Sequence, residues 1–104
     1  MLTFSSSPKI FGPNEDESLD GQATNKAFQE ISKTINESQG GNLSPEEVAL
    51  GFLRVAVEAM CRPVRSLTEA RGYETAGHNL VMFGGAGGQV ACAIAKTLGI
   101  KRTL

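Results

Sequence analysis

The sequence predicts an α/β protein in which helices pack around a strand that leads into a glycine-rich loop. Three observations carry this prediction. A long segment that begins at Pro45 has two apolar stripes at helical spacing, residues 80–83 form an uninterrupted apolar run, and the glycine-rich segment 84–88 separates this run from another apolar helix. The order helix, strand, glycine loop, helix is typical of one unit of an α/β domain.

Length and charge limit the function classes. The 104 residues leave room for at most one small domain. Ten basic residues against eleven acidic ones give a net charge of −1, so neither a nucleic-acid partner nor a membrane surface is predicted. No apolar run reaches the roughly 20 residues of a membrane span, and the N-terminus does not resemble a signal peptide. We therefore expect a soluble, cytoplasmic protein.

Apolar residues are distributed unevenly about residue 44. Residues 1–44 hold 12 of them, whereas residues 45–104 hold 30. Because ordering one residue costs about 1–2 kcal/mol, the polar first part is not expected to fold alone. We predict two parts: a polar extended segment with one amphipathic helix over 1–44, and a core unit over 45–104.

The first part is expected to contain one surface helix. Residues 1–20 are rich in serine, proline and acidic side chains and indicate a loop-rich, exposed segment. From about Ala23 to Glu37, apolar side chains recur every three to four residues, which predicts a helix packed by one stripe. Gly40 and Gly41 are expected to end it.

The second helix has the clearest start signal in the chain. Ser44 is the expected N-cap, Pro45 occupies the first helical position, and Glu47 completes a capping box. Pro63 predicts a kink or a short break just before it, because proline has no N–H for the preceding turn. Gly72 is the expected left-handed cap after the helix.

The last part of the chain carries the predicted strand. Residues 80–83 are apolar without alternation, which indicates a strand covered on both faces, as in a parallel sheet. A third helix is predicted from Gln89 to Leu98, ended by Gly99. Ile100 is expected to begin a second strand.

The glycine loop is the candidate functional site. A strand that runs into glycines and then a helix exposes backbone N–H groups beside the positive end of the helix dipole, and missing Cβ atoms let a phosphate or ribose approach. No Lys and Ser/Thr pair follows the glycines, and Val90 stands at the third glycine of the dinucleotide motif, so neither common nucleotide motif is present. The predicted nucleotide-binding residues are Gly84, Gly85, Ala86, Gly87, Gly88 and Gln89.

Purely structural interpretations of the same residues are also possible. The glycines can be there only because a tight turn with close packing requires them, and Gln89 can cap its own helix instead of binding a ligand. His78 is a lone histidine in a polar loop, which favours surface exposure. Cys61 and Cys92 lack metal-ligand spacing and are expected to be reduced thiols, with Cys92 in the core. No metal site and no catalytic residue are predicted from the pattern.

Four runs of residues between Glu46 and Ile100 carry a family resemblance. They are GFLRVA at 51–56, EAMCRP at 58–63, SLTEARG at 66–72 and FGGAGGQ at 83–89. In this order they resemble the ATP-dependent 5-oxoprolinase family (hydantoinase A/oxoprolinase). The segment PKIFGPNE at 8–15 is similar to the stretch that precedes this region in the same enzymes. The resemblance covers nearly the whole chain but little of the family's long polypeptide, so the chain is expected to be a short internal fragment.

The resemblance implies a fold and an activity. The activity is ATP-driven hydrolysis of 5-oxo-L-proline to L-glutamate, in glutathione metabolism, with Mg²⁺ and a monovalent cation such as K⁺. The fold is part of an actin-like ATPase (ribonuclease H-like), in which Gly84 and Gly85 approach the nucleotide most closely. The full-length enzyme is expected to be a homodimer that binds ATP and 5-oxoproline, and the isolated chain is expected to be inactive.

Two positions depart from the family pattern, and two other functions stay open. The resemblance leads us to expect Asn where Val57 stands and His where Val90 stands, so a polar group just beyond the loop is missing. The alternatives are a non-enzymatic nucleotide- or phosphate-binding module and a fragment of a hydantoinase-type cyclic amide hydrolase. A catalytic base and metal ligands are not assigned within the chain.

Overall fold

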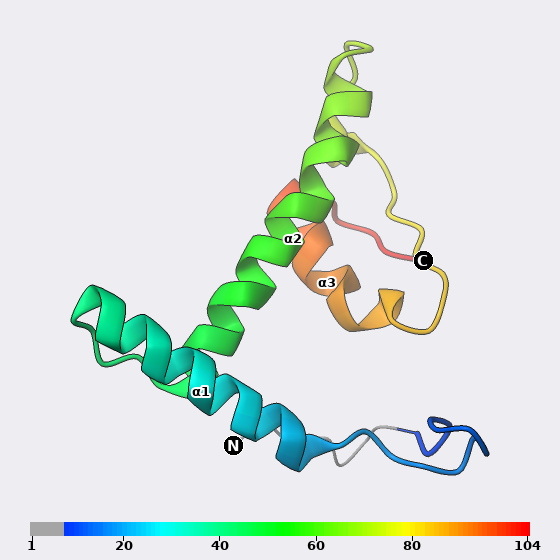
Figure 1. The fold of residues 1–104 in the computed structure, drawn as a ribbon. Helices are drawn as coiled ribbons and strands as arrows, with labels where there is room; N and C mark the ends of the chain where they lie inside the picture. The colour runs from blue at the N-terminus through cyan, green and yellow to red at the C-terminus, as the bar shows by residue number, and fades with distance from the viewer. Residues whose placement is uncertain (1–7) are drawn as a thin grey trace. The chain divides into compact units, whose positions relative to one another are not determined.

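A computed structural model of the chain describes residues 8–104 (Figure 1). This part contains three α-helices, α1 (Gly21–Gln39), α2 (Pro45–Glu69) and α3 (Gly87–Leu98), and a short 3-10 helix, η1 (Thr75–Gly77). The chain divides into two compact units, and the boundary between them falls within α2, after Gly51. None of the described helices is both long enough and apolar enough to cross a bilayer.

The prediction of an α/β fold is wrong for residues 8–104, which contain isolated β-bridges but no strand or sheet. The apolar run 80–83 is extended, and its one bridge is a parallel contact between Leu80 and Thr103. Backbone hydrogen bonds join the two segments from Leu80 N–H to Arg102 O (3.0 Å), Leu104 N–H to Leu80 O (2.8 Å) and Met82 N–H to Leu104 O (3.0 Å). The strand expected at Ile100 is likewise absent.

The run 80–83 fails as a strand because it has too few partners. A sheet becomes stable only when several strands share a buried face, and this run meets one short segment. Leu80 and Met82 pack against the core, whereas Val81 is 59% exposed and Phe83 is 90% exposed. The run is therefore covered on one face only, and the described residues do not form the partial actin-like (ribonuclease H-like) ATPase unit that the resemblance implied.

Helix α1 confirms the helix expected from about Ala23 to Glu37 and extends it at both ends. The Asp20 carboxylate accepts a hydrogen bond from Ala23 N–H (2.9 Å), which satisfies one of the free donors of the first turn. Gly40 ends the helix with φ of 66°, a left-handed conformation that glycine adopts without a steric cost. Its N–H donates to Asn36 O (2.9 Å).

A polar contact that the sequence did not predict fixes the turn after α1. The Leu43 carbonyl accepts from the Ser32 hydroxyl (2.6 Å) and from the Asn36 amide (2.9 Å). Leu43 N–H donates back to the Asn36 side-chain oxygen (2.8 Å). Ser32 is buried at 4% exposure, and its hydroxyl is satisfied by this contact. The turn thus returns to the side of α1 just before α2 begins.

The capping box at the start of α2 is confirmed. The Ser44 hydroxyl accepts from Glu47 N–H (3.2 Å), and Ser44 N–H donates to a Glu47 carboxylate oxygen (2.8 Å). The N–H groups of Ser44 and Glu47 have no acceptor within the helix, and each is therefore paired with the side chain of the other residue.

Replacing the cap tests its contribution to stability. Ser44→Ala is expected to lower the free energy of unfolding by about 1 kcal/mol, because the Glu47 N–H loses its acceptor. Chemical denaturation of the chain, followed by far-UV circular dichroism, measures the change. Ser38→Ala is the control: its hydroxyl bonds a carbonyl inside α1 at the exposed surface, so its loss should stay within about 0.5 kcal/mol. Equal losses for the two variants would contradict the cap.

Pro63 does not interrupt α2. The helix runs through it to Glu69, so the expected short break is absent from the structure. Gly72 follows with φ of 77°, as expected for a residue that turns the chain after a helix. Cys61 and Val64, on the two sides of Pro63, both contact the core.

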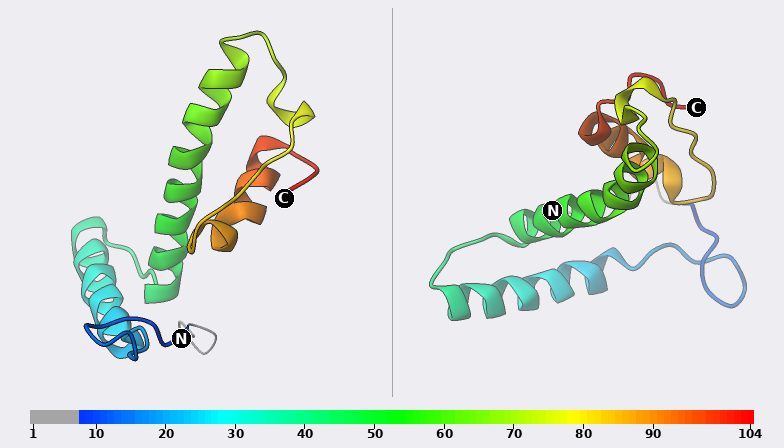
Figure 2. Two further views of the ribbon diagram at one scale, coloured as in Figure 1. Left: turned by 90° about the vertical axis from the view of Figure 1, so that its right-hand side faces the viewer. Right: turned by 90° about the horizontal axis from the view of Figure 1, so that it is seen from above.

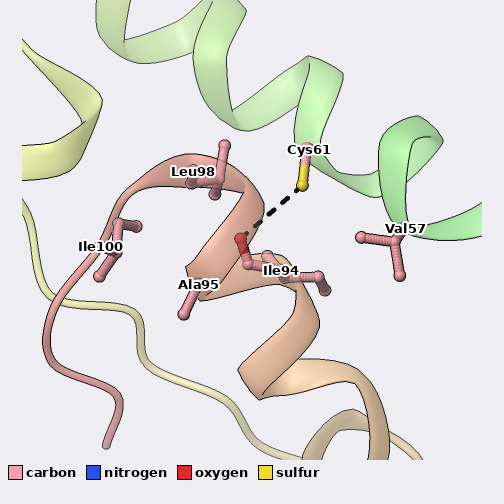
Figure 3. Packing of buried hydrophobic residues seen from close by; sticks show 6 residues of the cluster. All are labelled: Val57, Cys61, Ile94, Ala95, Leu98 and Ile100. Atoms are coloured by element: carbon pink, nitrogen blue, oxygen red, sulfur yellow. Dashed lines mark hydrogen bonds between the residues drawn. The ribbon is translucent and has the colours of Figure 1, made fainter. Parts of the chain in front are cut away.

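The core of the second unit lies between α2 and α3, which pack against each other (Figures 1 and 2). Figure 3 shows its buried side chains converging from the two helices and the segment after α3. Cys61 is fully buried, and its Sγ lies 3.9 Å from Ile94 O. Burial raises the pKa of the Cys61 thiol, which favours its neutral form. The cluster consists of Val57, Cys61, Ile94, Ala95, Leu98 and Ile100.

Two further contacts define α3 within this unit. The Arg65 guanidinium donates to Thr97 O (3.0 Å) in the last turn of α3 and forms an ion pair with Glu58 at 3.4 Å. This bond satisfies one of the carbonyls that a helix end leaves free. Cys92 is exposed on α3, so the prediction that it fills the core is wrong. The alanines on both sides of it gave no clear helical stripe from which its direction could be read.

Candidate functional site

The glycine loop joins the extended run 80–83 to α3. Residues 84–86 form the turn, and α3 begins at Gly87. Gly84 has φ of 93°, a backbone conformation that residues with a Cβ rarely adopt. All residues from Gly84 to Gln89 are exposed except Gly87, which is half-buried. The loop therefore presents its main chain to solvent.

Close packing does not explain the glycines at the centre of this loop. A Cβ built on Gly85 or on Gly88 would meet no described atom within 4 Å, and the same holds for Gly84. Only at Gly87 would a Cβ come near a side chain, the Met82 methyl at 3.5 Å, which is an ordinary contact. The space beside the main chain is therefore open, and a ligand needs such open space to approach the backbone.

The first turn of α3 has an uncapped positive end. Ala86 is the N-cap and offers no side-chain acceptor, and the first turn contains no acidic residue. Among the described residues, nothing accepts from the N–H groups of Gly87 and Gly88. Free N–H groups at a helix N-terminus attract an anion, because the peptide dipoles add there.

Gln89 does not cap its own helix in this structure. Its backbone N–H donates to Ala86 O (3.2 Å), and its exposed side chain makes no hydrogen bond within residues 8–104. The amide remains available for a ligand.

The two residues that depart from the family pattern lie in or beside the core. Val57 is 6% exposed and belongs to the core cluster, and Val90, in the first turns of α3, packs against the same cluster. Both sites are apolar, so the side chains that stand there suit their surroundings. A polar group at either position would need a partner that the cluster does not contain.

His78 is exposed, as its sequence context indicates, and lies outside the glycine loop. Its Nδ1 is 3.0 Å from Glu74 O, and its ring lies nearly perpendicular to the ring of Tyr73, with centroids 6.2 Å apart. His78 lines an open hollow of about 420 Å³, together with Lys101 and Arg102. These contacts hold His78 in a surface turn and join it to no catalytic partner among the described residues.

Metal ligands are not assembled in the part of the chain that the structure describes. No group of three or more His, Cys, Asp or Glu side chains comes together there. The residues present therefore do not fit a complete site for Mg²⁺, and no chemical step is assigned to a metal bound by this chain.

Comparison with known proteins identifies the family. A sequence model of the Hydantoinase/oxoprolinase family matches residues 4–104. The chain belongs to this family. It is 59% identical over 103 residues to the 5-oxoprolinase PfmaA of Pestalotiopsis fici and 57% identical over 97 residues to the 5-oxoprolinase of Saccharomyces cerevisiae. It is also 52% identical over 103 residues to the 5-oxoprolinase 1 of Arabidopsis thaliana.

The family members are much longer than this chain. These matches cover 99%, 93% and 93% of the chain but 8% of the length of each relative. No solved structure was found to match it. The family is thus established over nearly every residue of the chain, and the chain spans only a small part of such a polypeptide.

Proposed function

We propose that this chain is part of a 5-oxoprolinase, in which ATP cleavage drives hydrolysis of 5-oxo-L-proline to L-glutamate. The identity of 52–59% to three proteins with that name supports the reaction. The family resemblance further supports a homodimeric, cytoplasmic enzyme of glutathione metabolism that uses Mg²⁺ and K⁺. In this proposal residues 45–104 form part of the ATPase domain, preceded by the polar segment 1–44.

Residues Gly84, Gly85, Ala86, Gly87, Gly88 and Gln89 are proposed to contact the nucleotide. One observation carries this assignment: the loop leaves open space where Cβ atoms would stand, directly before the uncapped start of α3. The free N–H groups of Gly87 and Gly88 would donate to a phosphate, and the helix dipole would favour its negative charge. The Gln89 amide would add a donor at the same end of α3.

The chemistry of the lactam is assigned to other parts of the enzyme. ATP would transfer its γ-phosphoryl group to the lactam oxygen with release of ADP, which would make the amide carbon electrophilic. Water would then add to this carbon, and cleavage of the ring C–N bond with release of phosphate would give L-glutamate. The chain's own residues would bind and orient the phosphates. Residues 8–104 supply no assembled metal site, so the metal ligands and the general base are proposed to come from the remaining 5-oxoprolinase sequence.

A substitution in a chimera tests the nucleotide loop. The chain would replace the matching segment of the Saccharomyces cerevisiae 5-oxoprolinase, to which it is 57% identical. Gly85→Val is expected to weaken ATP binding about tenfold, because its side chain would fill the space beside the main chain, and a tenfold change corresponds to about 1.4 kcal/mol. Folding should be unchanged, since a Cβ at Gly85 meets nothing within 4 Å. Equilibrium binding of ATP measures the effect.

Gly77→Val provides the matched control for this test. Gly77 lies in η1 of the same unit, has no positive φ, and also has open space around its Cβ position. Its substitution should leave ATP affinity unchanged. Equal affinity in the Gly85→Val and Gly77→Val chimeras would refute the loop assignment. If instead the isolated chain melts cooperatively and ATP raises its melting temperature, the binding-module alternative gains support.

A further inference from the structure

Helix α2 carries a second apolar face within the unit 52–104. One side of this helix faces the core and carries Val57, Cys61 and Val64. Residues about two positions away lie on the opposite side, because successive residues are separated by about 100° around a helix. An exposed row recurs every four positions from that side toward one flank of the helix: Val55, Ala59, Pro63 and Leu67. The exposed Arg62 and Ser66 lie beside this row. We call these four residues, with Ala56 and Met60 beside them, the outer face of α2.

The outer face is more apolar than a solvated helix surface. Val55 is 69% exposed, Leu67 is 66% exposed and Met60 is 38% exposed. The 13 residues from Val55 to Leu67 extend over about 18 Å. Ser66 is a polar residue beside this row, whereas the side chains of the row itself are apolar. Apolar side chains over such a length are typical of a surface that another element covers.

The area of this face favours an occupant from the same polypeptide. A stripe about 18 Å long and about 10 Å wide offers on the order of 200 Å². A stable complex of separate chains buries about 800 Å² on each partner, so this face alone is too small to hold two free molecules together. A segment of the same polypeptide avoids most of the entropy cost of association and can be held by a smaller contact. The relatives contain this sequence as 8% of one chain, which leaves ample sequence to supply that segment.

We propose that an apolar helix from the remaining 5-oxoprolinase sequence packs on the outer face of α2. This inference rests on the proposed function. Ala56 and Ala59 form a flat floor between Val55 on one side and Met60 on the other, which lets a helix approach closely. Arg62 borders the face and forms no ion pair within residues 8–104. The occupant is therefore an apolar helix with an acidic side chain at its edge.

The same chimera with the Saccharomyces cerevisiae enzyme tests this surface. Ala59→Asp is expected to lower its melting temperature, measured without ATP, by about 5 °C or more, because the carboxylate would be buried against the covering helix. Arg54→Asp is the control, since it places the same side chain on the same helix at an exposed, already charged position. This variant should change the melting temperature by about 1 °C or less.

The outcomes separate this inference from the proposed function. Equal melting temperatures for the Ala59→Asp and Arg54→Asp chimeras would overturn the outer-face proposal. An Ala59→Asp chimera that does not fold, beside an Arg54→Asp chimera that does, would support it. A second result would also overturn the proposal. The Ala59→Asp substitution would leave the melting temperature of the chimera unchanged but would convert a dimer of the isolated chain into a monomer, which would make a second copy the occupant. The nucleotide loop is tested by ATP affinity instead, so Gly85→Val can still reduce binding if the outer face is not covered.

Discussion

The chain that carries Leu98→Ala is expected to lose about 3 kcal/mol of its free energy of unfolding. Leu98 is 6% exposed and lies in the core cluster between α2 and α3. Truncating a buried leucine removes its favourable transfer from water and leaves a cavity that the neighbours fill only in part. Because a small domain has only about 5–15 kcal/mol in total, the variant should unfold at a clearly lower denaturant concentration. Urea denaturation followed by circular dichroism measures the loss.

Leu67→Ala is the matched control for this prediction. Leu67 is also a leucine of the same unit, but it is 66% exposed on the outer face of α2. In the isolated chain its truncation should cost about 0.5 kcal/mol or less. In the chimera with the longer relative, the same substitution should become more costly, because the outer face is then covered. Equal losses for Leu98→Ala and Leu67→Ala in the isolated chain would show that the core is not the one described.

The features that were predicted correctly from the sequence depend on neighbours in the chain. The capping box of Ser44 and Glu47 spans three positions, and the left-handed glycines at Gly40 and Gly72 act within one turn of their own helices. Their physical causes are local hydrogen bonds and the absence of a Cβ, so a short window of sequence contains all the information needed.

The strand was predicted wrongly because a strand depends on distant partners. The uniform apolar run 80–83 indicates burial on both faces, yet it has one short parallel contact, at Thr103. Phe83 is 90% exposed, which shows that the second face lacks its cover among the described residues. Apolar patterning reports how much burial a segment requires, but it does not report whether the covering element lies within the same 104 residues.

The candidate loop could be located from its composition, but its properties required the structure. Glycine content alone left a tight turn and a ligand site as alternatives. The open space beside Gly85 and Gly88 and the missing cap at Ala86 became visible only with the backbone in place. The contact of Ser32 with the Leu43 carbonyl was missed for a related reason, since a serine on a helix carries no signal of a partner 11 residues away.

Val57→Asn is expected to lower the free energy of unfolding of the chain by about 3 kcal/mol. Val57 is 6% exposed and its neighbours in the core cluster are apolar. An asparagine there would bury an amide without a hydrogen-bond partner and would also lose the contacts of the two valine methyl groups. The family resemblance leads us to expect asparagine at this position. The variant therefore also measures how much the stability of this core depends on valine in place of that asparagine. Urea denaturation gives the change directly.

Val55→Asn separates burial from the intrinsic cost of asparagine in a helix. Both positions lie in α2, but Val55 is 69% exposed on the opposite side, so the two substitutions share the same change in helix propensity and differ in burial. Val55→Asn should therefore change the free energy of unfolding by about 0.5 kcal/mol or less. If Val57→Asn is no more costly than Val55→Asn, an internal polar partner or water must satisfy the amide. The apolar side chain at position 57 would then not be required by the packing of α2 on α3.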